Sequence, residues 1–142
     1  MIYTSLTKKA LNLAFKAHKD QLDKSGLPYI FHPFSLAEQM SDEYSICVAL
    51  LHDVIEDSKY TINDLIKLEF PDPVIEAVMV LTHSKNVPYF DYIEEVKKNP
   101  LATKVKIEDL KHNSDVTRLN EINNDDLQRI EKYKKALFIL ES

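Results

Sequence analysis

The sequence predicts a compact all-α domain of seven or eight helices over residues 1–142. Apolar residues recur with helical spacing along most of the chain, and no segment shows the alternating pattern of a half-buried strand. Glycine occurs only once, at Gly26, which excludes a glycine-rich phosphate loop or a dinucleotide fingerprint. At 142 residues, 44% of them hydrophobic, the chain is long enough to enclose one core.

The first two helices flank a polar loop. The first begins at Thr4 or Ser5, either of which can cap it, and its apolar stripe fades near Gln21. Residues 23–28 combine Asp, Ser, Gly and Pro and therefore predict a loop. A short helix over residues 33–40 follows, because proline suits the first helical turn.

The centre of the chain predicts one long helix and one short helix. Asp42 can cap a central helix that carries His52 through Glu56. Thr61 and Asp64 have the spacing of a capping box, which opens the next helix. The residues expected to face the core in that helix are Ile62, Leu65 and Ile66.

Four signals of proline, asparagine or aspartate begin the helices of the second half. Asp72-Pro73 opens an apolar helix, and Pro88 begins a short one. Asn99-Pro100 caps a longer helix, and Asn124 or Asp125 starts the last. The residues of the last helix expected to face inward are Leu127, Ile130, Leu137 and Leu140.

A cluster of ionisable residues follows the most apolar segment of the chain. If His52, Asp53, Glu56 and Asp57 continue the central helix, residues four apart share a face, and all four side chains point into one sector. A solvated helix end would explain the charges alone but not the apolar run before them. Buried charges are usually paired or bound to metal, so this segment predicts a metal site.

Two further candidate ligands lie elsewhere, although each taken singly could be a helix cap or a surface residue. Together, His32, His52, Asp53 and Asp109 supply two imidazoles and two carboxylates. This mixture suits Mn²⁺, Fe²⁺, Zn²⁺ or Ni²⁺ with open positions, rather than a closed structural zinc site. A divalent metal would polarise a phosphoryl oxygen and acidify a bound water.

Charge and hydropathy exclude several classes of partner. The formal charge is 18 − 23 = −5, so no general footprint for nucleic acid exists. No run reaches membrane-spanning length, and the single cysteine favours a reducing, cytoplasmic setting over disulfides. An anionic substrate would therefore have to be held by local cations or by a metal, and the oligomeric state stays open.

The order His32, then His52-Asp53, then Asp109 resembles the HD-domain metal phosphohydrolases. Longer strings resemble the hydrolase domain of the RelA/SpoT alarmone enzymes, over roughly residues 8 to 120. These strings are Lys24-Ser25-Gly26-x-Pro28-Tyr29-Ile30-x-His32-Pro33, Ala49-Leu50-Leu51-His52-Asp53-Val54-x-Glu56-Asp57, and Val105-Lys106-Ile107-x-Asp109-Leu110-x-His112-Asn113. The resemblance implies an HD-domain helical fold and a stand-alone small alarmone hydrolase, because a nucleotide-synthetase domain would not fit the chain.

The resemblance also implies the chemistry. The reaction would remove the 3′-pyrophosphate from ppGpp or pppGpp and leave GDP or GTP. The metal would be Mn²⁺, or another divalent transition metal, bound by His32, His52, Asp53 and Asp109. Glu56 and Asp57 would then serve the hydrolytic water. The residues implied to contact the nucleotide are Lys24, Ser25 and Asn113, with Lys85, Tyr92, Lys106 and Arg118 as further candidates.

One position departs from the family pattern. Asp23 stands where these enzymes usually have an arginine that is associated with the nucleotide base. A carboxylate does not stack as a guanidinium does, and it repels phosphate. The alternatives are therefore an HD phosphohydrolase for another nucleotide (ppApp, NADPH or a nucleoside monophosphate), or a non-catalytic nucleotide sensor. The intact Glu56-Asp57 pair argues against a sensor, which has no need to activate water.

Overall fold

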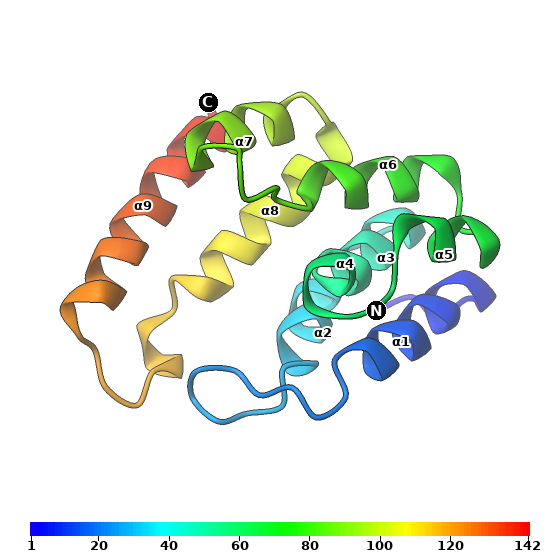
Figure 1. Ribbon diagram of the computed structural model, residues 1–142, viewed down its shortest axis with the longest axis horizontal. Helices are drawn as coiled ribbons and strands as arrows, with labels where there is room; N and C mark the ends of the chain where they lie inside the picture. Colours follow the sequence, from blue (N-terminus) through cyan, green and yellow to red (C-terminus); the bar gives the residue numbers. More distant parts are fainter.

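The computed structural model describes all 142 residues and confirms the predicted compact all-α fold (Figure 1). The helices are α1 Ser5–Ala17, α2 Phe31–Glu38, α3 Glu43–Leu51, α4 Val54–Asp57, α5 Ile62–Lys67, α6 Asp72–Leu81, α7 Tyr89–Lys97, α8 Pro100–Asn113 and α9 Asn124–Glu141, with a 3₁₀ turn at Val116–Arg118. Counting α3 and α4 together, as the one central helix that the sequence predicts, gives eight α-helices.

Helix α3 forms the centre of the core. Its residues from Ser45 to Leu51 are all buried, and it packs against α1, α2, α6 and α8. The Asp42 carboxylate caps its start, accepting the Ser45 N–H at 2.9 Å. Because neighbours surround α3, a side chain at its C-terminal end is held in a fixed position.

The central helix is interrupted just where the candidate ligands lie. We predicted a continuous helix through Glu56, but α3 ends at Leu51, and His52 and Asp53 form a turn before α4. The His52 side chain bonds to the Ala49 carbonyl, with 2.6 Å between Nδ1 and O. A regular helix would use this carbonyl for the Asp53 N–H, so the side chain competes with the helical ladder. The prediction of one continuous central helix that carries His52 through Glu56 was therefore wrong.

The predicted caps agree with the structure, but two inward-facing assignments were wrong. Thr4, Asp42, Thr61 and Asn99 each accept a backbone N–H at a helix start, and α9 begins at Asn124. Ile66 and Leu127, in contrast, are 55% and 52% exposed. Helix α5 is short and buries only Leu65, and α9 buries a stripe through Asp126, Ile130, Ala136 and Leu140. Local spacing alone does not fix how a helix is rotated about its axis.

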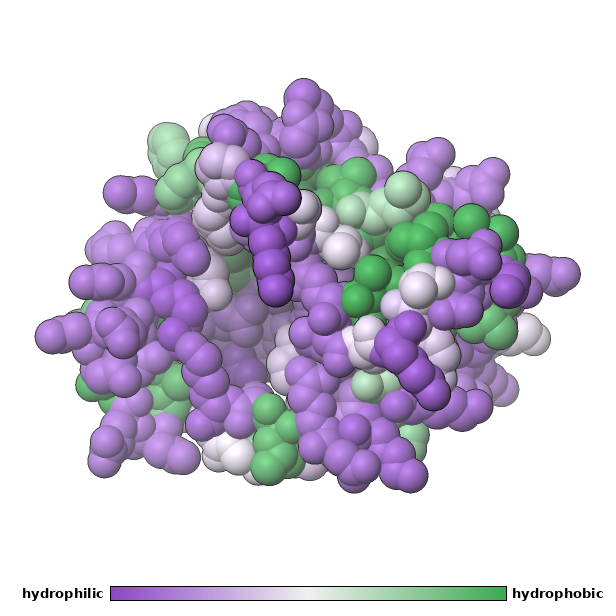
Figure 2. Space-filling view, in the orientation of Figure 1, coloured by the Kyte–Doolittle hydropathy of each residue, from purple (hydrophilic) through white to green (hydrophobic).

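Helix α8 connects the two sides of the molecule. It packs against α2, α3 and α6 on one side and against α7 and α9 on the other (Figure 1). The space-filling view shows a hollow near the middle of this face, lined mainly by hydrophilic residues (Figure 2). None of the helices combines the length and the apolar character needed to cross a bilayer.

Candidate active site

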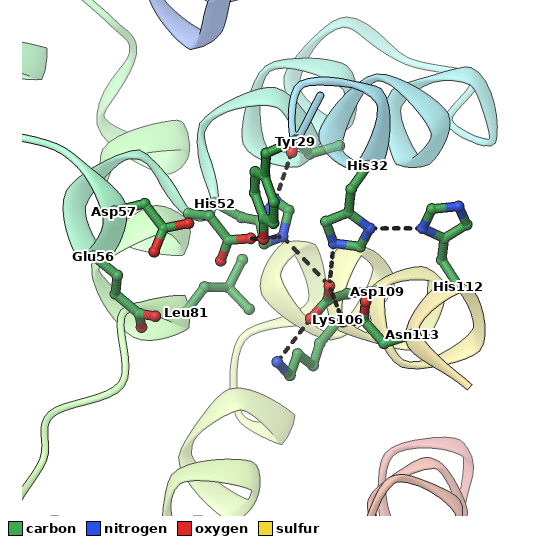
Figure 3. Close-up of polar contacts among 12 residues, drawn as sticks. Tyr29, His32, His52, Glu56, Asp57, Leu81, Lys106, Asp109, His112 and Asn113 are labelled. Atoms are coloured by element: carbon green, nitrogen blue, oxygen red, sulfur yellow. Dashed lines mark hydrogen bonds and ion pairs between the residues drawn. The ribbon is translucent and has the colours of Figure 1, made fainter. Parts of the chain in front are cut away.

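Three of the predicted ligands meet in the interior. His32 on α2, His52 after α3 and Asp109 on α8 each expose 4% or less of their surface. One ligand atom from each lies within 4.8 Å of the others. The Asp109 Oδ1 atom is 2.8 Å from His32 Nε2 and 3.4 Å from His52 Nε2 (Figure 3). Residues up to 77 positions apart in the sequence therefore converge on one point.

Asp53 extends this group on the side of His52. Its Oδ2 atom is 3.0 Å from His52 Nε2, and it accepts a hydrogen bond of 2.5 Å from the Tyr29 hydroxyl. Burial opposes ionisation of Asp53, but the adjacent imidazole outweighs this and holds its pKa at about 2. The four predicted ligand residues thus lie together, and we call them the ligand cluster.

The protonation state of His52 tests whether this cluster fits a metal. A carbonyl oxygen only accepts, so the contact with Ala49 places the proton of the neutral ring on Nδ1. The lone pair of Nε2 then faces carboxylate oxygens of Asp53 and Asp109, and this buried atom has no hydrogen-bond donor. Burial disfavours charge on the ring, yet these carboxylates raise the pKa of His52 well above its ordinary value. The arrangement therefore attracts a cation, and its nitrogen and oxygen donors suit a divalent metal.

Lys106 and Asn113 hold Asp109 in place. Lys106 Nζ lies 2.8 Å from Asp109 Oδ2, with its side chain only 14% exposed. Asn113 donates to Oδ1 at 3.1 Å from one turn further along α8, on the face that the sequence predicted. Despite burial, Lys106 and the two ligand histidines keep the pKa of Asp109 well below its usual range.

His112 orients the imidazole of His32 from behind. The two Nδ1 atoms are 2.6 Å apart, and the rings stack with centroids separated by 4.9 Å. Burial, together with the positive charge that His32 carries when protonated, lowers the pKa of His112 to about 4, so it is neutral near pH 7. A neutral His112 can accept from the Nδ1–H of His32, which directs the Nε2 lone pair of His32 toward the cluster.

Glu56 and Asp57 lie beside the cluster, on the side away from His112 (Figure 3). Glu56 accepts the His83 backbone N–H, and Asp57 accepts from the Gln21 side chain at 3.2 Å. Partial burial raises the pKa of both carboxyls, and the negative charge of Asp53 adds to this effect. Both groups are thus shifted toward the pKa range that suits a general base at neutral pH.

A cleft of about 270 Å³ opens next to the cluster. Tyr29 and Asn113, which bond to Asp53 and Asp109, form part of its wall. Its lining includes three of the predicted substrate contacts besides Asn113, and two α9 residues that sequence reasoning missed. The predicted residues are Lys24, Ser25 and Arg118, and the missed ones are Arg129 and Tyr133. Nothing in the spacing of α9 marks these two, because the cleft forms only when α9 packs on α8.

Asp23 has bonding partners on its own loop and across the cleft. Its carboxylate accepts the N–H groups of Ser25 and Leu27, at 2.9 and 3.0 Å. It also lies 3.5 Å from the Arg118 guanidinium, while the Ser25 hydroxyl donates to the Arg118 carbonyl. The negative charge that we expected to repel phosphate is therefore paired with a cation.

Three other candidate substrate residues, Lys85, Tyr92 and Lys106, are not part of the lining of this cleft. Lys85 is exposed between α6 and α7 and is not among the cleft residues. Tyr92 is buried, its hydroxyl donates to the Leu81 carbonyl at 2.6 Å, and its ring lies under Lys106. In this structure Tyr92 supports Lys106 rather than facing the cleft.

Comparisons with known proteins identify the family of the chain. A family model described as HD domain matches residues 10–138. The chain is 31% identical to the GTP pyrophosphokinase of Streptomyces coelicolor, over 94% of this chain and 16% of that protein. It is 43% identical to the guanosine-3′,5′-bis(diphosphate) 3′-pyrophosphohydrolase of Haemophilus influenzae, over 46% of this chain and 10% of that protein. The chain thus spans less than a fifth of these curated relatives.

A solved structure shares the fold. It is described as a metazoan ortholog of SpoT that hydrolyses ppGpp, and it superposes with a TM-score of 0.79 at 23% identity. The match covers 99% of this chain and 87% of the other. With the family model matching most of its length around the histidine–aspartate cluster, this chain belongs to the HD domain family.

Proposed function

We propose that this HD domain is a metal-dependent phosphohydrolase that removes the 3′-pyrophosphate from ppGpp or pppGpp, leaving GDP or GTP. The observation that carries the proposal is the direct junction between the ligand cluster and a cleft containing Lys24, Arg118 and Arg129. The cleft lining carries three cations against two carboxylates, Asp23 and Asp115, so it has a positive balance in a chain of net charge −5, which favours an anionic ligand. The names of the curated relatives point to the same substrate.

The residues of the cluster would hold the metal. His32, His52, Asp53 and Asp109 supply the donors, and we propose Mn²⁺ because two imidazoles and two carboxylates suit it. When bound, a divalent metal would polarise the phosphoryl group and lower the pKa of the attacking water. Lys106 and Asn113 would keep Asp109 oriented throughout, since both already contact it.

The remaining residues would bind the substrate and handle the proton. Lys24, Arg118 and Arg129 would pair with phosphate oxygens, while Ser25 and Asn113 would offer hydrogen bonds. Glu56 or Asp57 would take the proton of the attacking water, because burial raises the pKa of each carboxyl. We propose that residues 1–142 act as one domain of this kind, in the cytoplasm, where the buried Cys47 would stay reduced.

The test is product analysis with purified protein and Mn²⁺. Pyrophosphate and orthophosphate are followed with ppGpp, ppApp, GMP and NADPH, each with an EDTA control. We expect EDTA-sensitive pyrophosphate release from ppGpp. No product from any of the four nucleotides would contradict the proposal and favour a sensor.

A second candidate function rests on Asp23. Its carboxylate stands where the family resemblance leads us to expect a base-associated arginine, which favours a different base or a dinucleotide in the cleft. Pyrophosphate release from ppApp alone would assign adenine specificity. Orthophosphate from NADPH or GMP would instead indicate one of the other HD phosphohydrolase activities.

A further inference from the structure

A chain of side-chain hydrogen bonds connects the end of α1 to Asp57. The buried imidazole of His18 contacts the Gln21 amide, with 2.8 Å between Nδ1 and Oε1. The Nε2 atom of Gln21 lies 3.2 Å from Asp57 Oδ2. Gln21 also lines the cleft, so it lies between the substrate space and this carboxylate.

The chemistry of the three groups fixes the direction of these bonds. An ionised Asp57 can only accept, so Gln21 must present its NH₂ group to it. The Gln21 oxygen is then left to accept from His18, which must carry its proton on Nδ1. The other ring nitrogen of His18 is buried and has no partner, so no competing contact selects the opposite tautomer. Each group therefore sets the orientation of the next.

The position of His18 is itself fixed by the fold. It caps the C-terminal end of α1, and its N–H donates to the Ala14 carbonyl at 3.0 Å. Its ring packs against Tyr29, with centroids 4.9 Å apart, and Tyr29 donates to Asp53. Beyond Gln21, the Tyr29 N–H donates to the Gln21 carbonyl at 2.8 Å, which holds the two ends of the loop together.

We propose that Gln21 and His18 are positioning residues for Asp57. Gln21 holds the carboxylate in the direction from which it receives the proton of water, and His18 fixes the Gln21 amide. This inference rests on the proposed function, because it gives Asp57 a catalytic role. Gln21 acts mainly on turnover, although it lines the cleft, because its NH₂ group is occupied by Asp57.

The experiment compares Gln21→Leu, which keeps the volume but loses both hydrogen bonds, with Gln39→Leu, an exposed control at the end of α2. Turnover of ppGpp and the pH titration of the Asp57 carboxyl carbon by NMR are measured in each. We expect Gln21→Leu to lower kcat about tenfold or more while KM changes less than about twofold. The pKa of Asp57 rises, because a hydrogen bond to its ionised form is lost. Gln39→Leu changes neither quantity.

Two substitutions of His18 separate positioning from packing. His18→Asn keeps an N–H donor near the place of Nδ1, whereas His18→Phe keeps a ring without a donor. We expect the Asn variant to retain most of kcat and the ordinary Asp57 titration, and the Phe variant to resemble Gln21→Leu. Equal loss in the Asn and Phe variants, with both still folded, would overturn the role of His18.

The remaining outcomes decide the inference about Gln21. A raised KM with unchanged kcat in Gln21→Leu would show a substrate contact and overturn the positioning role. An unchanged Asp57 titration would overturn it as well. If the unmodified protein hydrolyses no nucleotide, the proposed function fails, and the NMR titration, which needs no turnover, still decides whether Gln21 and His18 control Asp57.

Discussion

Tyr29 and Asn113 connect the ligand cluster to the adjoining cleft, but the two regions are stabilised in different ways. Cluster residues come from α2, α8 and the end of α3, all parts of the packed core, and three of the four are almost fully buried. The cleft is bounded by the loop before α2 and by α9, and several of its side chains remain open to solvent. The proposed metal ligands thus lie in the core, whereas most of the proposed substrate contacts lie on a loop and on a peripheral helix.

The charged side chains of the two regions also differ in their burial and in how many partners they have. In the cluster, Lys106 is buried against Asp109, so losing either partner leaves a charge without compensation. In the cleft, Arg118 is 3.5 Å from Asp23 and also donates to the His112 carbonyl, so it has more than one partner near solvent. We therefore expect substitutions in the cluster to affect both folding and metal binding, and substitutions in the cleft to affect mainly the substrate.

The largest expected effect is that of Asp109→Ala. It removes a proposed metal ligand and leaves the largely buried Lys106 ammonium group without its partner, which should lower the free energy of unfolding by about 3–5 kcal/mol. Glu95→Ala is the matched control, because Glu95 and Lys98 form a pair of the same spacing and distance, 2.8 Å, on the exposed surface. Urea unfolding and Mn²⁺ titration measure both effects. Mn²⁺ affinity that survives Asp109→Ala would contradict the ligand assignment.

Glu56→Ala and Asp57→Ala should separate catalysis from metal binding. Neither residue belongs to the buried group of His32, His52 and Asp109, so we expect Mn²⁺ to bind as before while turnover falls by about 100-fold or more. Steady-state kinetics and Mn²⁺ titration of the same samples test this. Undiminished turnover in both variants would exclude the proposed role in activating water.

His112 should make stability depend on pH. The unfolded chain takes up a proton on this residue near pH 6.5, whereas the folded protein resists protonation until about pH 4. The unfolded state thus binds more protons between these values, and the contribution of His112 to stability is lost as the pH falls through this window. Urea unfolding at pH 7.5 and pH 5 should show a larger stability loss for the unmodified protein than for His112→Asn. Equal losses would refute this assignment.

The smallest effects are expected at Asp23. Asp23→Asn keeps an oxygen that accepts the Ser25 and Leu27 N–H groups but loses the charge facing Arg118. It should alter KM for ppGpp and leave kcat and stability nearly unchanged. Asp23→Ala loses the loop hydrogen bonds as well, which should cost about 1 kcal/mol of stability. Kinetics and thermal unfolding of the two variants distinguish the roles, and identical behaviour would show that the loop bonds contribute nothing.

Sequence reasoning predicted the features that short-range chemistry determines. Asp42, Thr61 and Asn99 cap their helices because a cap depends only on the next few residues. The grouping of His32, His52, Asp53 and Asp109 followed from residue types and from family strings. The rotation that exposes Leu127, and the approach of Arg129 to the cleft, depend on how α9 packs, which no local pattern contains.

The interruption between α3 and α4 has a consequence for attempts to transplant this metal site. On an uninterrupted helix, only the spacing of a histidine and an aspartate would decide how their side chains meet. Here the backbone chooses the tautomer, because the Ala49 carbonyl accepts the Nδ1 proton of His52 and leaves Nε2 free to coordinate. Substitutions that convert the turn at His52 and Asp53 into regular helix would favour helix formation. The Ala49 carbonyl would then accept the backbone N–H of Asp53 instead of the His52 side chain. A more regular helix at this position would therefore leave His52 less suited to bind a metal through Nε2.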